Sequence, residues 1–126
     1  MVLELDSHGF PKTSGIFETI KTLNGQPIAL ARHMRRALDS ARSLGLKMPP
    51  EEELRTDLRK ILHDEPHEVG KLRICIYADG FHLSHDEYIE PTSPLRFTFF
   101  SQTISGEEHK QFPYDHRFAL LKSAQD

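Results

Sequence analysis

The first candidate for chemistry in this sequence is Lys122, a primary amine that follows the apolar run at 118–121 (FALL). Burial among apolar side chains lowers the pKa of a lysine, and the deprotonated amine can then form a Schiff base with a carbonyl compound. Taken alone, a lysine at the end of a strand is usually a solvated charge. A reactive role for Lys122 therefore needs support from the rest of the chain.

The eight histidines raise the question of a metal site. Ligand types gather at residues 63–68 (HDEPHE) and around His82, His85 and Asp86. Neither group has the spacing of a zinc motif on one helix face, and the single cysteine, Cys75, allows no cysteine pair. Residues three apart on a strand point to opposite faces, which argues against a shared ion at His82 and His85. We expect no metal, and we expect Cys75 to be inert and partly buried.

A hairpin is predicted near the start of the chain, where residues 15–23 (GIFETIKTL) are rich in β-branched and aromatic types. Asn24-Gly25 follows, and then a second apolar run begins, which is a strong signal for a tight turn between two strands. Alternation along the first strand sets two groups of side chains on opposite faces. One face takes Phe17, Thr19 and Lys21, and the other takes Ile16, Glu18 and Ile20.

Two helices are predicted next. The first has an apolar stripe that ends at Leu44, with Gly45 as its C-cap. Arg36 lies well away from that stripe, so by itself it reads as a surface arginine paired with Asp39 or Ser40. The second helix opens with prolines and glutamates, which suit a helix N-terminus. The expected buried positions are Leu30, Met34, Ala37, Leu38, Ala41 and Leu44 in the first helix, and Leu54, Leu58, Ile61 and Leu62 in the second.

Strands are expected to return at residues 72–77, at 81–89 as a polar edge strand, and at 95–100. Hairpin, two helices and antiparallel strands together predict an α+β fold, with two helices on one face of an antiparallel sheet. We expect this domain to occupy residues 1–103, followed by a polar interdomain linker at 104–116. Residues 117–126 then read as the first strand of a second domain.

Composition excludes several classes of function. Apolar residues make up 37% of the 126 residues and charged residues 28%, which is typical of a soluble globular domain. The formal net charge of −3, with both signs interspersed, gives no electrostatic footprint for nucleic acid. Apolar runs are too short to span a membrane, and the first ten residues are too charged for a signal peptide. A cytoplasmic location is expected.

Residues 15–49 carry a motif that resembles the class IV aminotransferase family of pyridoxal-phosphate (PLP) enzymes. The family motif is a G-x-F-E-T-type strand, a tight turn, and a helix with H-x-x-R followed by a Ser-Ala pair. Several offsets match together over about 35 residues, and the later elements follow in the family's order. The matching positions here are Gly15, Phe17, Glu18, Thr19, His33, Arg36, Ser40 and Ala41.

The resemblance implies roles that the residues alone do not establish. It makes Lys122 the Schiff-base lysine and Arg36 a ligand of the PLP phosphate, because arginine can offer a forked pair of donors. Phe17, Thr19 and Lys21 would line the substrate side, and Arg73 would lie near the site. The resemblance also implies the smaller N-terminal domain of a two-domain enzyme, in a homodimer, with an acidic partner for the pyridine nitrogen in the second domain. We therefore expect the 126 residues alone to be inactive.

Three activities share the family architecture: branched-chain aminotransferase, D-amino-acid aminotransferase and 4-amino-4-deoxychorismate lyase. The strand F-E-T-I-K, with Thr19 and then Lys21, looks most like the lyase group, whose reaction releases pyruvate and 4-aminobenzoate. Branched-chain enzymes more often resemble F-E-G-I-R. The approach at residues 6–15 diverges from relatives, which leaves the substrate open. The alternative from another class is a truncated, non-catalytic domain used for binding or assembly.

Overall fold

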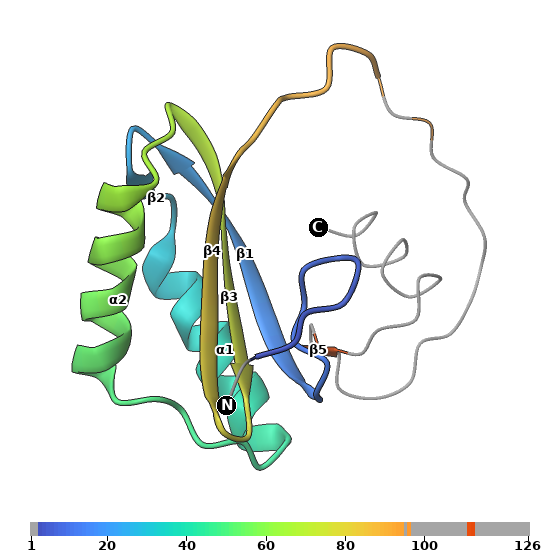
Figure 1. Ribbon diagram of the computed structural model, residues 1–126, viewed down its shortest axis with the longest axis vertical. Helices are drawn as coiled ribbons and strands as arrows, with labels where there is room; N and C mark the ends of the chain where they lie inside the picture. Colours follow the sequence, from blue (N-terminus) through green and yellow to red (C-terminus); the bar gives the residue numbers. More distant parts are fainter. Residues whose placement is uncertain (1–2, 95, 97–110, 113–126) are drawn as a thin grey trace.

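The computed structural model describes residues 3–94, 96 and 111–112. Its elements, in chain order, are β1 (Gly15–Leu23), β2 (Gln26–Pro27), α1 (Leu30–Ser43), α2 (Glu51–Asp64), β3 (Val69–Tyr77), β4 (Gly80–Glu87) and β5 (Gln111–Phe112). The strands form an antiparallel sheet in the order β2-β1-β3-β4, and β5 also pairs with β1. Both helices lie on one side of this sheet, and the N-terminal loop lies on the other (Figure 1). The expected α+β fold is confirmed.

The β1–β2 hairpin turns at Asn24-Gly25, as the sequence predicts. Leu23 pairs with Gln26, and Asn24 and Gly25 both have positive φ angles, of 48° and 78°. Two consecutive residues of positive φ define the turn type whose twist matches that of the flanking strands. Gly45, with a φ of 68°, ends α1 as predicted, since its N–H donates to the carbonyl of Arg42.

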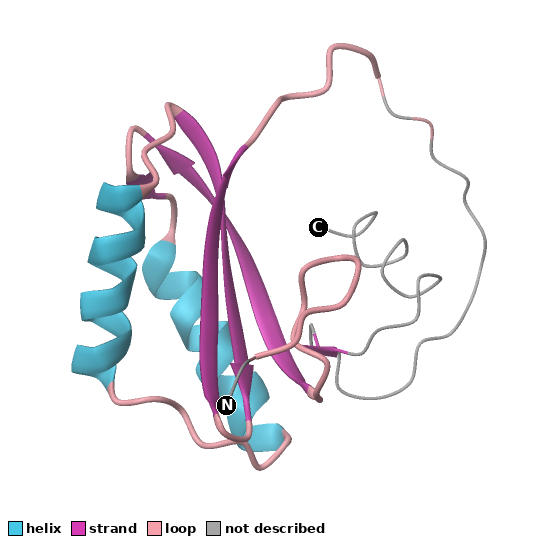
Figure 2. Ribbon diagram, viewed as in Figure 1, coloured by secondary structure: helices cyan, strands magenta, loops and turns pink. Residues whose placement is uncertain are grey.

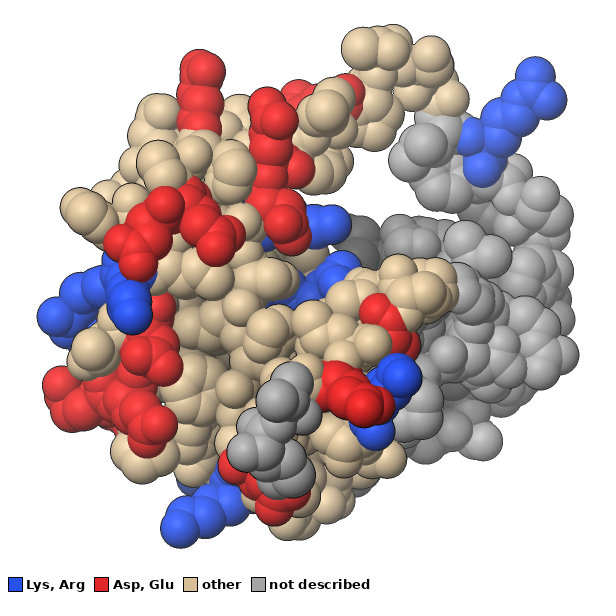
Figure 3. Space-filling model, viewed as in Figure 1, with Lys and Arg blue, Asp and Glu red and all other residues tan. Residues whose placement is uncertain are grey.

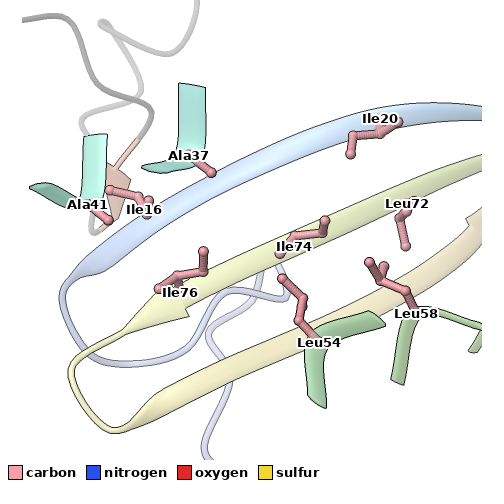
Figure 4. Close-up of a cluster of buried hydrophobic side chains, with 9 residues drawn as sticks. All are labelled: Ile16, Ile20, Ala37, Ala41, Leu54, Leu58, Leu72, Ile74 and Ile76. Atoms are coloured by element: carbon pink, nitrogen blue, oxygen red, sulfur yellow. The ribbon is translucent and has the colours of Figure 1, made fainter. Parts of the chain in front are cut away.

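The main core lies between the sheet and the two helices (Figure 4). Small residues on α1 let that helix approach β1 closely, while α2 packs larger side chains beside β3 and β4. Figure 4 shows the two sets of helical side chains directed toward the strands. The buried cluster consists of Ile16, Ile20, Ala37, Ala41, Leu54, Leu58, Leu72, Ile74 and Ile76.

Some predicted core positions are not buried. Leu44 is 42% exposed because it follows the last helical residue, where the chain leaves the sheet. Leu62 and Leu38 are only half-buried, since each lies at the margin of its helix's apolar stripe. The predicted edge strand is confirmed as β4. Of the expected strand at 95–100, the structure describes only Arg96, which is in a loop.

A second, smaller cluster lies on the helix-free face of the sheet. The loop at residues 3–14 is closed by a bridge between Leu5 and Pro11 and covers this face near the start of β1 (Figure 2). Phe10 from the loop is buried against Cys75 and packs on Phe17, with ring centroids 4.7 Å apart. The expected strand at 117–126 and most of the expected linker at 104–116 lie outside the described residues. Within that linker range, Gln111–Phe112 forms β5 against Gly15 and Ile16.

Candidate functional site

The helix-free face of the sheet brings together four of the predicted site residues. β1 and β3 pair so that Phe17 lies opposite Cys75, Thr19 opposite Arg73, and Lys21 opposite Lys71. Directly opposite residues of an antiparallel pair share a face, with Cβ atoms about 5 Å apart. Phe17, Thr19, Lys21 and Arg73 are therefore neighbours, and the predicted split of β1 into two faces is confirmed.

This face carries both signs of charge. Lys71 adds a cation that was not predicted from the sequence, and Asp86 of β4 lies opposite it. Only the register of β1 against β3 places Lys71 beside Lys21. Figure 3 shows basic side chains emerging between strand β4 and the N-terminal loop. Lys21 also pairs with Glu90, and their hydrogen bond raises the pKa of Lys21 and lowers that of Glu90. Both groups are exposed, so solvent screens the pair strongly.

Arg73 joins the N-terminal loop to the sheet. Its Nη1 donates to the carbonyl oxygen of His8 at 3.0 Å, and its guanidinium carbon lies 4.3 Å from the centre of the Phe10 ring. Within the described part of the chain, the Nε of Arg73 is buried without a hydrogen-bond partner. A buried N–H without an acceptor costs about 1–3 kcal/mol. The N-terminal loop thus holds the positive charge of Arg73 in place beside Thr19.

The opposite face of β1 carries a second cluster, built on Glu18. Nε and Nη2 of Arg36 donate to the two carboxylate oxygens of Glu18 at 2.8 and 2.7 Å, and Nδ1 of His33 lies 2.6 Å from Oε2. His33 and Arg36 are three residues apart on α1, so both face the same strand. The sequence alone predicts no partner for Glu18. Its signal was a carboxylate among apolar neighbours on the core face, which requires a buried counter-charge.

Arg36 also borders a hollow of about 590 Å³ along the N-terminal half of α1. Three of its lining residues are arginines, and this excess of positive charge suits a phosphate group better than a neutral ligand. The donor set therefore fits the phosphate of PLP. The lining residues described are Ala29, Ala31, Arg32, His33, Arg35, Arg36 and Asp39.

The two clusters meet along β1, because Glu18 stands between Phe17 and Thr19 in the chain and points to the other face. At one end of β1, β2 pairs only with Thr22 and Leu23, and at the other end β5 pairs only with Gly15 and Ile16. Among the described residues, no strand covers the outer edge of β1 between these pairings. A ligand at that edge can contact both clusters. Lys122 lies outside the described residues, so its role stays a prediction.

Other reactive side chains on the sheet are not arranged for chemistry. His85 is buried on the helix side, while His82 lies across from Cys75 on the helix-free face, where partial burial lowers its pKa. Within residues 3–94, 96 and 111–112 there is no cluster of ligands that could hold a metal ion. Burial raises the pKa of the Cys75 thiol to about 12, which keeps it protonated and unreactive. Neither α1 nor α2, the helices in the described residues, has the length and apolar character needed to cross a bilayer.

Comparisons with known proteins identify the family of the chain and a solved structure with a similar fold. A family model described as "Amino-transferase class IV" matches residues 15–121. Among solved structures, one named "Crystal Structure of Putative 4-amino-4-deoxychorismate lyase" superposes with a TM-score of 0.65 at 24% sequence identity. The superposition covers 99% of this chain and 55% of that one, so this chain spans about half the length of its structural neighbour. No protein with a curated description matches the sequence.

Proposed function

Because this chain belongs to the class IV amino-transferase family, we propose that it forms the N-terminal part of a PLP-dependent enzyme that acts on an amino-acid-like substrate, most like 4-amino-4-deoxychorismate lyase. The single observation that carries the proposal is the arrangement around β1. Thr19 and Lys21 of β1 lie on one face of the sheet. Glu18 of β1 lies on the other face, where it pairs with Arg36. The family match and the fold of the structural neighbour support this reading.

We assign the predicted site residues the following parts. When bound, PLP supplies the electron sink that makes a substrate Cα proton removable. Arg36 is our candidate for holding the phosphate, from the hollow beside α1. Lys122 is our candidate for the amine that would hold the cofactor and would act as the general base toward the Cα proton.

The cations of the helix-free face favour the lyase over a branched-chain aminotransferase. Pyruvate and 4-aminobenzoate each carry a carboxylate, so the lyase substrate that yields both carries two carboxylates. Lys71 and Arg73 on β3 can meet two carboxylates, and Lys21 of β1, paired with Glu90, lies beside them. A branched-chain amino acid has one carboxylate and an apolar side chain, for which three cations are a poor surface. The hydroxyl of Thr19, opposite Arg73, is our candidate for orienting one substrate carboxylate.

A substrate comparison tests the proposal. The purified full-length enzyme that contains these residues, rather than the 126 residues alone, is supplied with PLP and assayed with 4-amino-4-deoxychorismate. 4-Aminobenzoate is followed by its fluorescence and pyruvate by a coupled reduction. Parallel assays offer L-leucine or D-alanine with 2-oxoglutarate. We expect equal amounts of 4-aminobenzoate and pyruvate, and a Lys71→Gln variant with KM raised about tenfold, as for loss of one charged hydrogen bond. Transamination without 4-aminobenzoate would favour an aminotransferase, and neither reaction would favour a binding domain.

A further inference from the structure

Glu18 is a charged residue in an apolar layer. Its side chain lies on the core face of β1, between Ile16 and Ile20, and only 2% of the residue is exposed. An ionised carboxylate in such a place is stable only when opposite charge and hydrogen bonds meet both oxygens. Burying the carboxylate costs desolvation free energy, so a glutamate at this position indicates a role that an apolar residue cannot fill.

The contacts of Glu18 are directed at one edge of the Arg36 guanidinium. Oε1 accepts from Nε at 2.8 Å and Oε2 accepts from Nη2 at 2.7 Å, which is the forked geometry of a bidentate pair. Oε2 of Glu18 also lies 2.6 Å from Nδ1 of His33. Since a carboxylate can only accept, Nδ1 is the donor and carries the proton of the His33 ring. Nη2 of Arg36 and Nδ1 of His33, 3.4 Å apart, then share one acceptor.

This pairing determines where the rest of the guanidinium points. A guanidinium is planar and has two edges suited to forked recognition, and Glu18 takes the edge formed by Nε and Nη2. The edge formed by Nη1 and Nη2 is the one that Glu18 does not occupy. The Arg36 side chain is 44% exposed and lines the hollow beside α1, so its guanidinium is within reach of a group in the hollow. A flexible arginine is thus held in one orientation before any ligand arrives.

We propose that Glu18, supported by His33, is a positioning residue that orients Arg36 to receive an anionic group in the hollow. The inference rests on the proposed function in one respect, namely that the anionic group is the phosphate of PLP. If Glu18 acts by its charge, its removal has the opposite effect on phosphate affinity from the one expected if it acts by orienting Arg36. A carboxylate near a phosphate repels it, so on charge alone the removal of the Glu18 charge tightens phosphate binding. If Glu18 acts by orienting Arg36, its removal weakens binding, because the arginine must then be ordered by the ligand.

The experiment compares PLP with pyridoxal, which has the same aldehyde and ring but no phosphate. Dissociation constants are measured by absorbance titration of the purified protein, and the ratio of the pyridoxal constant to the PLP constant isolates the phosphate contribution. We expect Arg36→Gln to lower this ratio about 50-fold and Glu18→Gln to lower it about tenfold, or about 1.4 kcal/mol. The double variant is expected to match Arg36→Gln alone, because Glu18 acts through Arg36. Glu87→Gln, at an exposed glutamate of β4, is the matched control and leaves the ratio unchanged.

The outcomes separate the inference from the proposed function. A wild-type protein without preference for PLP over pyridoxal overturns both, and an unchanged ratio in Arg36→Gln overturns the proposed role of Arg36. If Arg36→Gln lowers the ratio but Glu18→Gln leaves it unchanged or raises it, only the inference fails. Equal losses for PLP and pyridoxal in Glu18→Gln show a purely structural role and also overturn it. Should Glu18→Gln not fold, His33→Gln, which keeps the Glu18–Arg36 pair, must lower the ratio about threefold, and an unchanged ratio there rejects the inference.

Discussion

Replacing Gly70 by alanine would place a methyl group inside a buried hydrogen bond. Gly70 of β3 lies opposite Thr22 of β1, and Thr22 Oγ1 is 2.7 Å from His85 Nε2. A Cβ at Gly70 would stand 2.4 Å from Thr22 Oγ1 and 2.3 Å from His85 Nε2, both far inside van der Waals contact. His85 also donates from Nδ1 to the carbonyl oxygen of Glu65 at 2.8 Å, so its ring has little freedom to move aside.

The expected cost follows from these contacts. Thr22 and His85 are 0% and 1% exposed, so parting them leaves buried polar atoms without partners, at about 1–3 kcal/mol. The overpacking itself adds about 1–3 kcal/mol. Together they give a loss of about 4 kcal/mol, a large part of the ~5–15 kcal/mol of a typical domain.

Urea unfolding followed by circular dichroism measures this loss. Gly25→Ala is the matched control, since a Cβ there meets nothing within 4 Å and only the positive φ of 78° opposes it, at about 1–2 kcal/mol. Adding His85→Ala to Gly70→Ala removes one clashing partner, so the double variant should lose less than the sum of the two single losses. A Gly70→Ala protein within 1 kcal/mol of wild type would refute the reasoning.

Three further predictions concern the helix-free face. Cys75 should resist a thiol reagent at pH 8 in the folded protein and react at once in 6 M guanidinium, because burial raises its pKa to about 12; fast labelling of the folded protein would contradict this. Thr19→Val should lower lyase kcat about tenfold to a hundredfold with PLP affinity retained, whereas unchanged turnover would remove Thr19 from the chemistry. Arg73→Lys should raise the KM for the substrate about tenfold and speed proteolytic cleavage within residues 3–14. Cleavage becomes faster because lysine cannot stack on Phe10 as the guanidinium does. Cleavage at the wild-type rate would show that Arg73 does not hold the loop.

The sequence predicted the features that depend on local pattern. Alternation along β1 was enough to set Thr19 and Glu18 on opposite faces, because strand periodicity does not depend on the partner strand. Asn24-Gly25 and Gly45 mark backbone positions of positive φ, which only a few residue types adopt readily. These elements were therefore predictable from short stretches of sequence.

The contacts that give the site its character depend on packing between distant segments. A helical wheel sets Arg36 far from the apolar stripe of α1, but its long side chain reaches back to Glu18, eighteen positions earlier in the chain. Lys71 joins the helix-free face only through the register of β3 against β1. Cys75 was expected to be partly buried, and its complete burial beneath Phe10 depends on the path of the N-terminal loop. None of these contacts can be predicted from periodicity or residue type alone.

Reduction of the cofactor complex tests the central claim most directly. The purified protein is incubated with PLP, its absorbance is recorded at the visible edge, and borohydride is added before tryptic mapping by mass spectrometry. The account predicts an absorbance band that disappears on reduction and a phosphopyridoxyl group on Lys122. A colourless protein that takes up no PLP, or a label spread over surface lysines with none on Lys122, would contradict it.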